Sequence, residues 1–143
     1  MPNAFAFAML AAWPFVTIVL FRTLPRERAL IWTLLGGYLL LPPVAAFDLP
    51  LVPPLDKTSI PNLAALAGLV LVAGARLGPL RLSVPERALL ALFVASPFAT
   101  VLNNSETVAL GEGGELQGLR LHDALSAVTN QLIFLLPYFF GRW

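Results

Sequence analysis

The chain has 143 residues, of which 58 % are hydrophobic and only 12 % are charged. Soluble domains carry about 25 % charged residues and disordered chains carry more, so the composition excludes both classes and leaves an integral membrane protein. The lack of cysteine and the single histidine exclude disulfide scaffolds, thiol catalysis and His–His metal pairs, and the net charge of +1 gives no electrostatic preference for nucleic acid.

The charged residues leave five uncharged windows along the chain, each 18 to 21 residues long. Because an α-helix rises about 1.5 Å per residue, roughly 20 residues cross the ~30 Å hydrocarbon layer of a bilayer. Each window therefore predicts a spanning helix. We expect an all-α, polytopic membrane protein, a single transmembrane region over residues 1–143, with helices at about 4–21, 26–47, 61–77, 86–103 and 123–141.

The first predicted helix is followed, and not preceded, by basic residues. Met1-Pro2-Asn3 carries none, and the first basic side chain is Arg22. A signal peptide has the opposite order, so we interpret this helix as retained in the protein. Pro14 predicts a kink, and Trp13 is too central for an interfacial belt, so we expect its indole to pack inside the protein.

Prolines mark both ends of the second predicted helix. Pro25 suits a first helical position, because the N–H that proline lacks would be unpaired there anyway. Pro42-Pro43 then break or bend the helix. The outer loop 48–60 is rich in proline, leucine and valine, and we expect it to be an extended, semi-rigid segment on the outer membrane face.

Small residues are frequent in the third predicted helix, where Ala64 and Gly68 are four residues apart on one face. Such faces let helices approach closely inside lipid. The fourth predicted helix starts near Pro85, and Pro97 predicts a kink within it.

The outer loop 104–122 contains Gly111-Glu112-Gly113-Gly114, which matches no nucleotide-binding fingerprint and predicts a turn. The fifth predicted helix starts with Asp123 as its N-cap. Ser126 and Asn130 share one of its faces, and polar groups inside a membrane need partners on other helices. We therefore expect packing with further helices of a longer chain or with a partner subunit, and interpret the chain as the N-terminal portion of a larger bundle.

The basic residues predict an orientation. Seven of the nine lysines and arginines fall on the side of the inner loops 22–25 and 78–85, and two, Lys57 and Arg120, fall on the side of the outer loops 48–60 and 104–122. The side rich in cations is cytoplasmic by the positive-inside rule. The N-terminus is therefore predicted outside and the C-terminus in the cytoplasm.

Three segments carry a family resemblance: LIWTLLGGYLLL at 30–41, FDLPLVPPLDK at 47–57 and GLRLHDALS at 118–126. Together they resemble the N-terminal part of bacterial O-antigen polymerase/ligase-like membrane proteins of polysaccharide biosynthesis. The resemblance implies a multi-pass protein of the bacterial inner membrane that acts on O-antigen or exopolysaccharide units carried on a polyprenyl pyrophosphate. The family's catalytic periplasmic loop is absent from this chain, so the resemblance supplies no catalytic residue.

Three outer side chains are candidates for contacting the carrier's phosphates: Arg120, Lys57 and His122. Cations bind phosphate through charge-assisted hydrogen bonds, and arginine binds it bidentately. The structural alternative is that Lys57 pairs with Asp56, that Arg120 balances an acidic loop, and that His122 is simply solvated. One histidine and no cysteine supply no nucleophile–base–acid set, so we predict no catalytic, metal-binding or cofactor-binding residue.

Two other functions fit the sequence. A small transporter or flippase subunit is favoured by the proline-interrupted helices and Asn130, although no ionisable residue lies inside a window. A structural membrane subunit is favoured by the small-residue face of the third helix.

Overall fold

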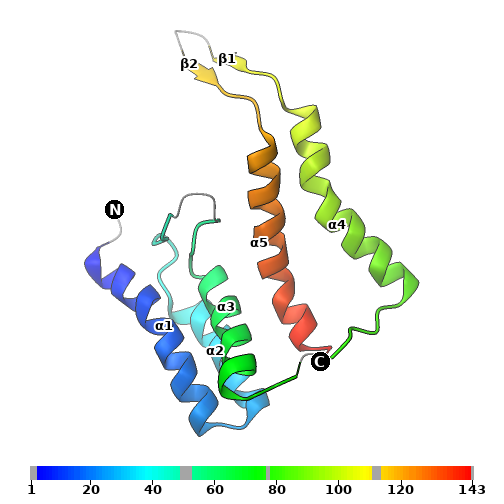
Figure 1. Ribbon diagram of the computed structural model, residues 1–143. Coiled ribbons are helices and arrows are strands. Elements are labelled where there is room, and N and C mark those ends of the chain that lie inside the picture. Colours follow the sequence, from blue (N-terminus) through cyan, green and yellow to red (C-terminus); the bar gives the residue numbers. More distant parts are fainter. Residues whose placement is uncertain (1–2, 49–52, 77, 111–113, 143) are drawn as a thin grey trace. The chain divides into compact units, whose positions relative to one another are not determined.

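The computed structural model describes residues 3–48, 53–76, 78–110 and 114–142. The chain forms two compact units, the first from residues 1–50, 54–80 and 133–143 and the second from residues 51–53 and 81–132. The predicted all-α class is confirmed: the described residues form five α-helices, together with one π-helix and a short two-stranded hairpin (Figure 1). The elements are α1 (Ala4–Thr23), α2 (Arg26–Leu40), α3 (Ser59–Ala67), the π-helix η1 (Gly68–Val72), α4 (Val84–Asn103), β1 (Val108–Leu110), β2 (Gly114–Leu116) and α5 (Leu121–Phe140).

The first unit is built around α1, α2 and α3, which pack against one another (Figure 1). Its core has two clusters of buried residues. One contains Leu10, Trp13, Leu41, Ala45 and Ile60, and the other contains Phe21, Ala29, Ala65, Leu69 and Phe140. Trp13 is only 5 % exposed, which confirms that it packs inside the protein.

Glycine allows the closest helix contacts in this unit. A Cβ atom placed on Gly37 would overlap the ring of Pro61 and lie 2.9 Å from Trp13 Nε1. A Cβ atom placed on Gly68 would lie 2.5 Å from the ring of Phe21. Real Cβ contacts are longer than these distances, so only glycine lets the neighbouring side chains approach so far.

The helix α2 ends at Leu40, just before the predicted break at Pro42-Pro43, and the segment up to residue 47, the outer bound given to this helix, is not helical. Leu41 precedes Pro42 and has φ −75° and ψ 143°, the extended conformation that a following proline imposes. The chain then turns back, and the backbones of Phe47 and Leu55 exchange two hydrogen bonds of 3.0 Å. The middle of the predicted outer loop, residues 49–52, lies outside the described residues.

The third predicted helix, at 61–77, is α-helical only over Ser59–Ala67. The backbone then widens into η1, where the Ala73 N–H donates to the Gly68 carbonyl. Gly74 follows with φ 61°, a left-handed conformation that glycine adopts without strain and that commonly ends helices.

The second unit contains α4, the strands β1 and β2, and the first part of α5. The Glu86 carboxylate accepts a hydrogen bond of 2.7 Å from the Ser83 backbone N–H and so fixes the start of α4. The strands pair antiparallel with Ala109 opposite Glu115, inside the predicted outer loop 104–122. Of the predicted glycine-rich turn, residues 111–113 lie outside the described part of the chain.

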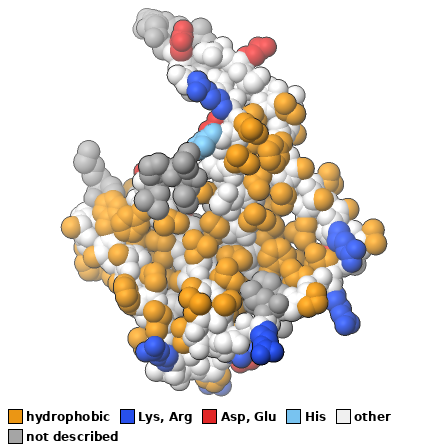
Figure 2. All heavy atoms as spheres, in the orientation of Figure 1, with side chains coloured by type: hydrophobic (Ala, Val, Ile, Leu, Met, Phe, Trp, Pro, Cys, Tyr) orange, Lys and Arg blue, Asp and Glu red, His pale blue; other side chains and the backbone are white. Residues whose placement is uncertain are grey.

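Two of the five helices, α1 and α4, are long and apolar enough to cross a membrane. The helix α2 has 15 residues, α3 and η1 together cover 59–72, and α5 carries a polar stretch at residues 129–131. Figure 2 shows hydrophobic side chains over much of the visible surface of the helices. The exposed apolar side chains of α4 include Leu89, Leu92 and Leu102, which are 67 %, 69 % and 79 % exposed.

Candidate functional site

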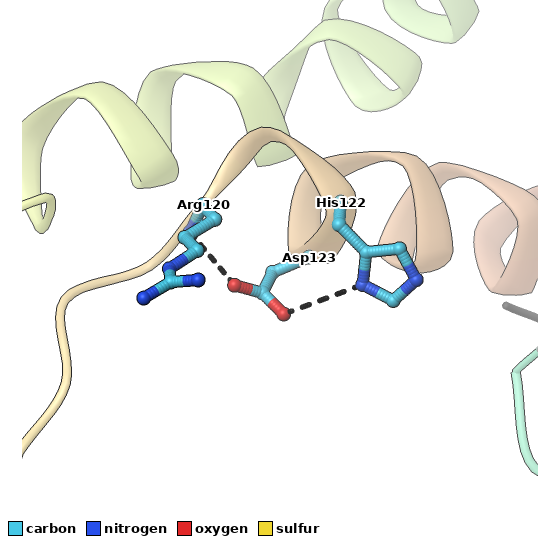
Figure 3. Close-up of polar contacts among 3 residues, drawn as sticks. All are labelled: Arg120, His122 and Asp123. Carbon is cyan, nitrogen blue, oxygen red and sulfur yellow. Dashed lines mark hydrogen bonds and ion pairs between the residues drawn. The ribbon is translucent and has the colours of Figure 1, made fainter. Parts of the chain in front are cut away.

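The start of α5 holds two of the three predicted phosphate-binding side chains, Arg120 and His122 (Figure 3). The Asp123 carboxylate accepts a hydrogen bond of 2.7 Å from the Arg120 backbone N–H, and its other oxygen lies 3.9 Å from His122 Nδ1. Because α5 begins at Leu121, Asp123 lies inside the first turn and not at the predicted N-cap. A carboxylate there stabilises the helix start, where unpaired N–H groups carry partial positive charge.

This cluster is open to solvent. The side chains of His122 and Asp123 are 56 % and 48 % exposed, and Arg120 is exposed as well. Arg120 bonds Asp123 through its backbone, so this hydrogen bond uses none of the five N–H donors of the guanidinium. These donors are available for the paired hydrogen bonds that guanidinium groups form with phosphate.

Lys57, the third predicted residue, belongs to the first unit, whereas Arg120 and His122 belong to the second. Its Nζ donates to the Tyr38 carbonyl oxygen at 3.5 Å. Within the described part of the chain, no ion pair joins Lys57 to Asp56. The arrangement therefore tethers Lys57 to the end of α2.

Asp56 has a structural role at the start of α3. Its carboxylate accepts hydrogen bonds from the backbone N–H groups of Thr58 and Ser59, both at 2.8 Å, and from both hydroxyl groups. Burial raises the pKa of Asp56, but these hydrogen bonds outweigh burial and hold the pKa below its usual value. Asp56 therefore acts as an ionised cap of α3.

A pocket of about 320 Å³ lies between α4 and α5 in the second unit. Asp123 lines it, so the pocket adjoins the exposed cluster with Arg120 and His122. Gln131 Nε2 donates to Ser96 Oγ at 3.3 Å, and Gln131 Oε1 is buried with no hydrogen-bond partner among the described residues. An unpaired buried acceptor costs about 1–3 kcal/mol, and a hydrogen-bond donor that reached this oxygen would offset that cost.

Pro97 explains why Ser96 can accept that bond. Proline has no N–H, so it leaves the Phe93 carbonyl, four residues earlier, without its helical donor. The Ser96 hydroxyl donates to this carbonyl at 2.8 Å, which turns its lone pairs towards other donors such as Gln131. Pro97, the residue at which a kink was predicted, therefore orients the Ser96 hydroxyl that lines the pocket.

In the first unit, a polar side chain from another helix likewise bonds a carbonyl that a proline leaves without a helical donor. Pro137 leaves the Ile133 carbonyl of α5 without a helical donor. Asn62 of α3, which is fully buried, donates to that carbonyl through Nδ2 at 3.1 Å. Its Oδ1 accepts a hydrogen bond of 2.6 Å from the Tyr38 hydroxyl. One amide therefore links α2, α3 and the end of α5.

Gln131, which lines the pocket, belongs to the same polar stretch of the fifth predicted helix as Asn130. Asn62, which forms the buried network, was not among the predicted residues. A signal for Asn62 was present, because it is the only amide in the uncharged window 58–75. The free Ile133 carbonyl could also be predicted, because Pro137 leaves the carbonyl four residues before it without a donor.

The described residues contain no group of three or more acidic or histidine side chains that could hold a metal ion. Comparisons with protein-family models, with curated proteins and with solved structures gave no match. The resemblance to O-antigen polymerase/ligase-like proteins therefore stays a prediction.

Proposed function

We propose that this chain is a membrane-embedded region of a polysaccharide polymerase- or ligase-like protein, which binds a polyprenyl-linked glycan at the start of α5. In this proposal the exposed Arg120 guanidinium, with His122 beside it, contacts the carrier's phosphates. The hydroxyl groups of the adjoining sugar enter the pocket between α4 and α5. Lys57, which belongs to the other unit and is tethered to the Tyr38 carbonyl, stays a separate and weaker candidate for contacting carrier phosphate.

The surface of α4 supports the membrane part of this proposal. Within this 20-residue apolar helix, Pro97 is the only described residue that is buried. An apolar helix exposed on nearly all sides is unfavourable in water, because each exposed leucine forgoes about 1.5–3 kcal/mol of burial. Contact with lipid removes that cost. We infer that α4 and α1 span the bilayer.

The shorter helices are compatible with the multi-pass arrangement, in which the N-terminus is outside and the C-terminus is in the cytoplasm. Irregular backbone is tolerated at membrane depth where protein surrounds it. The segment after α2 fits this condition, because Leu41 and Ala45 are only 2 % and 1 % exposed. The freed Ile133 carbonyl is likewise bonded by Asn62, as a proline kink inside lipid requires.

One observation carries the glycan part of the proposal: Asp123 belongs both to the exposed cluster and to the pocket. A cation that suits phosphate therefore adjoins a pocket with a buried, unpaired amide oxygen. A polyprenyl-linked glycan carries both phosphate groups and sugar hydroxyl groups, and the hydroxyl groups are hydrogen-bond donors. The two halves of the site match the two halves of such a ligand.

Titration of the purified chain in detergent tests this proposal, with a polyprenyl pyrophosphate and with the same carrier bearing a sugar. We expect Arg120→Gln to weaken both ligands about tenfold, because a charge-assisted hydrogen bond is worth about 1.5–3 kcal/mol. Gln131→Leu should weaken only the carrier that bears a sugar. Arg22→Gln, an equal charge change on an exposed residue of α1, is the matched control.

The same variants define the contrary results. If Arg120→Gln and Arg22→Gln weaken binding equally, the carrier responds to diffuse charge and not to this cluster. If the sugar adds no affinity that depends on Gln131, the pocket does not receive the glycan.

A small transporter or flippase subunit is a second candidate, and the buried Gln131 Oε1 favours it, because transport sites use polar groups inside interrupted helices. Uptake of a solute by protein reconstituted in vesicles, lost in Gln131→Leu, would favour this function. A structural subunit would instead bind no carrier and would co-purify with a stoichiometric partner.

A further inference from the structure

The first unit contains a separate pocket of about 190 Å³, formed by residues from the start of α2, from η1 and the segment after it, and from the end of α5. Its charged lining residues are Arg26, Arg76 and Glu27, and its apolar lining includes Leu69 and Phe140. A water molecule accounts for about 30 Å³ of the liquid, so the pocket has room for a phosphate group. None of these residues belongs to the proposed glycan site.

The pocket has an apolar base and a cationic rim. Leu69 and Phe140 are 6 % and 7 % exposed and belong to the buried core, whereas Arg26 and Arg76 are exposed. This distribution suits an amphipathic ligand, with its charged group at the rim and its apolar part against the base.

Arg26 is oriented by the protein. Its Nη2 donates to the Ala73 carbonyl at 3.4 Å, which holds the guanidinium over the segment after η1. A guanidinium has five N–H donors, so this bond still leaves donors for an oxygen acceptor. Arg76, three residues after Ala73, supplies a second guanidinium to the same pocket.

We propose that this pocket binds the phosphate of an anionic lipid headgroup between Arg26 and Arg76. Guanidinium groups suit phosphate, and basic pockets beside membrane helices on the cytoplasmic side bind anionic headgroups. The positive-inside rule assigns both arginines to that side. The inference rests on the proposed membrane placement of the chain, but it concerns a different ligand, face and set of residues.

Glu27 makes the proposal more specific. Its carboxylate lines the same pocket and opposes an anion. Removing this charge should therefore strengthen binding, whereas removing either arginine should weaken it. Non-specific binding of lipid to the apolar surface would predict neither the gain for Glu27→Gln nor the loss for the arginine variants.

The test is a titration of the full chain in a non-ionic detergent with short-chain phosphatidic acid. Matched titrations use short-chain phosphatidylcholine, which has no net charge, and inorganic phosphate, which has no apolar part. We expect phosphatidic acid to bind most tightly. Arg26→Gln and Arg76→Gln should each weaken it about tenfold, and Glu27→Gln should strengthen it about fivefold.

Arg28→Gln is the matched control, because Arg28 is an exposed arginine of α2 that does not line the pocket. The proposal is overturned if Arg28→Gln weakens binding as much as Arg26→Gln, or if inorganic phosphate binds as tightly as phosphatidic acid. Arg26 also bonds the Ala73 carbonyl, so the unfolding midpoint of each variant without lipid is measured to confirm an intact fold.

Alkaline extraction of membranes from cells that express the chain tests the membrane placement separately. Release of the wild-type chain into the soluble fraction would contradict the proposed membrane function. The titration in detergent would still decide whether the pocket binds the lipid.

Discussion

At the scale of single residues, Asp56 links the stability of α3 to pH. Its pKa is lower in the folded chain than the ~3.9 of a free aspartate, so its carboxylate stabilises the fold above about pH 4. This contribution is lost as the pH falls through the lowered folded value, because both states are then protonated. We expect Asp56→Ala to lower the free energy of unfolding by about 0.5–2 kcal/mol at neutral pH.

Thermal unfolding in detergent between pH 3 and pH 7 measures this effect. The difference between wild type and Asp56→Ala should shrink as the pH falls below about 4. Asp48→Ala, which changes an exposed carboxylate before the same loop, is the control and should show little effect. A constant difference across the pH range would mean that Asp56 acts through packing and not through its charge.

The lack of a side chain at Gly37 allows α2 to pack closely against Pro61 and Trp13. We expect Gly37→Ala to destabilise the fold by about 1–3 kcal/mol, although alanine favours helices, because its Cβ atom would overlap Pro61 and press on Trp13. Gly141→Ala is the control, since its nearest atom would be 3.6 Å away. Unfolding midpoints of both variants check this prediction, and equal midpoints would contradict the close contact.

At the scale of helices, the prolines account for the buried polar side chains. In a Pro137→Ala background, the new N–H can bond the Ile133 carbonyl and replace the hydrogen bond from Asn62. We therefore expect Asn62→Ala to cost about 1–3 kcal/mol in the wild type and less in this background, and the difference is the coupling energy of the double-mutant cycle.

Tyr38→Phe supplies the control for this cycle. The Tyr38 hydroxyl donates to Asn62 Oδ1, whereas the Ile133 carbonyl accepts its hydrogen bond from Asn62 Nδ2. Its removal should cost the same with Pro137 and with alanine at that position. If Asn62→Ala also costs the same in both backgrounds, the carbonyl left free by proline is not the reason why Asn62 is buried.

The helices also show what could be predicted from the sequence. Apolar windows between charged residues located all five helices, because helix length and charge exclusion follow directly from composition. The windows alone extend past the end of α2, which the sequence signals instead through Pro42-Pro43. They did not indicate the π-helix η1, which begins at Gly68, where a Cβ atom would meet the ring of Phe21. The pocket combines Ser96 and Gln131, which are 35 residues apart, and no local pattern reports such a pairing.

At the scale of the whole molecule, the basic residues predict which ends of the helices share a membrane side. Moving a charged loop across the bilayer is unfavourable, and arginine and lysine near spans remain in the cytoplasm. The chain lacks cysteine, so single cysteines report their own location without background labelling. Ser105 and Ser83 are suitable positions, because both are exposed and lie at opposite ends of α4.

In intact spheroplasts we expect Ser105→Cys to react with a membrane-impermeant maleimide, and Ser83→Cys to react only after permeabilisation. The reverse pattern would put Arg120 in the cytoplasm, away from any periplasmic carrier phosphate, and would move Arg26 and Arg76 to the outer face. Labelling of both positions in intact spheroplasts would mean that α4 does not span the bilayer. Its exposed leucines would then have to be covered by another protein, which is the structural-subunit function.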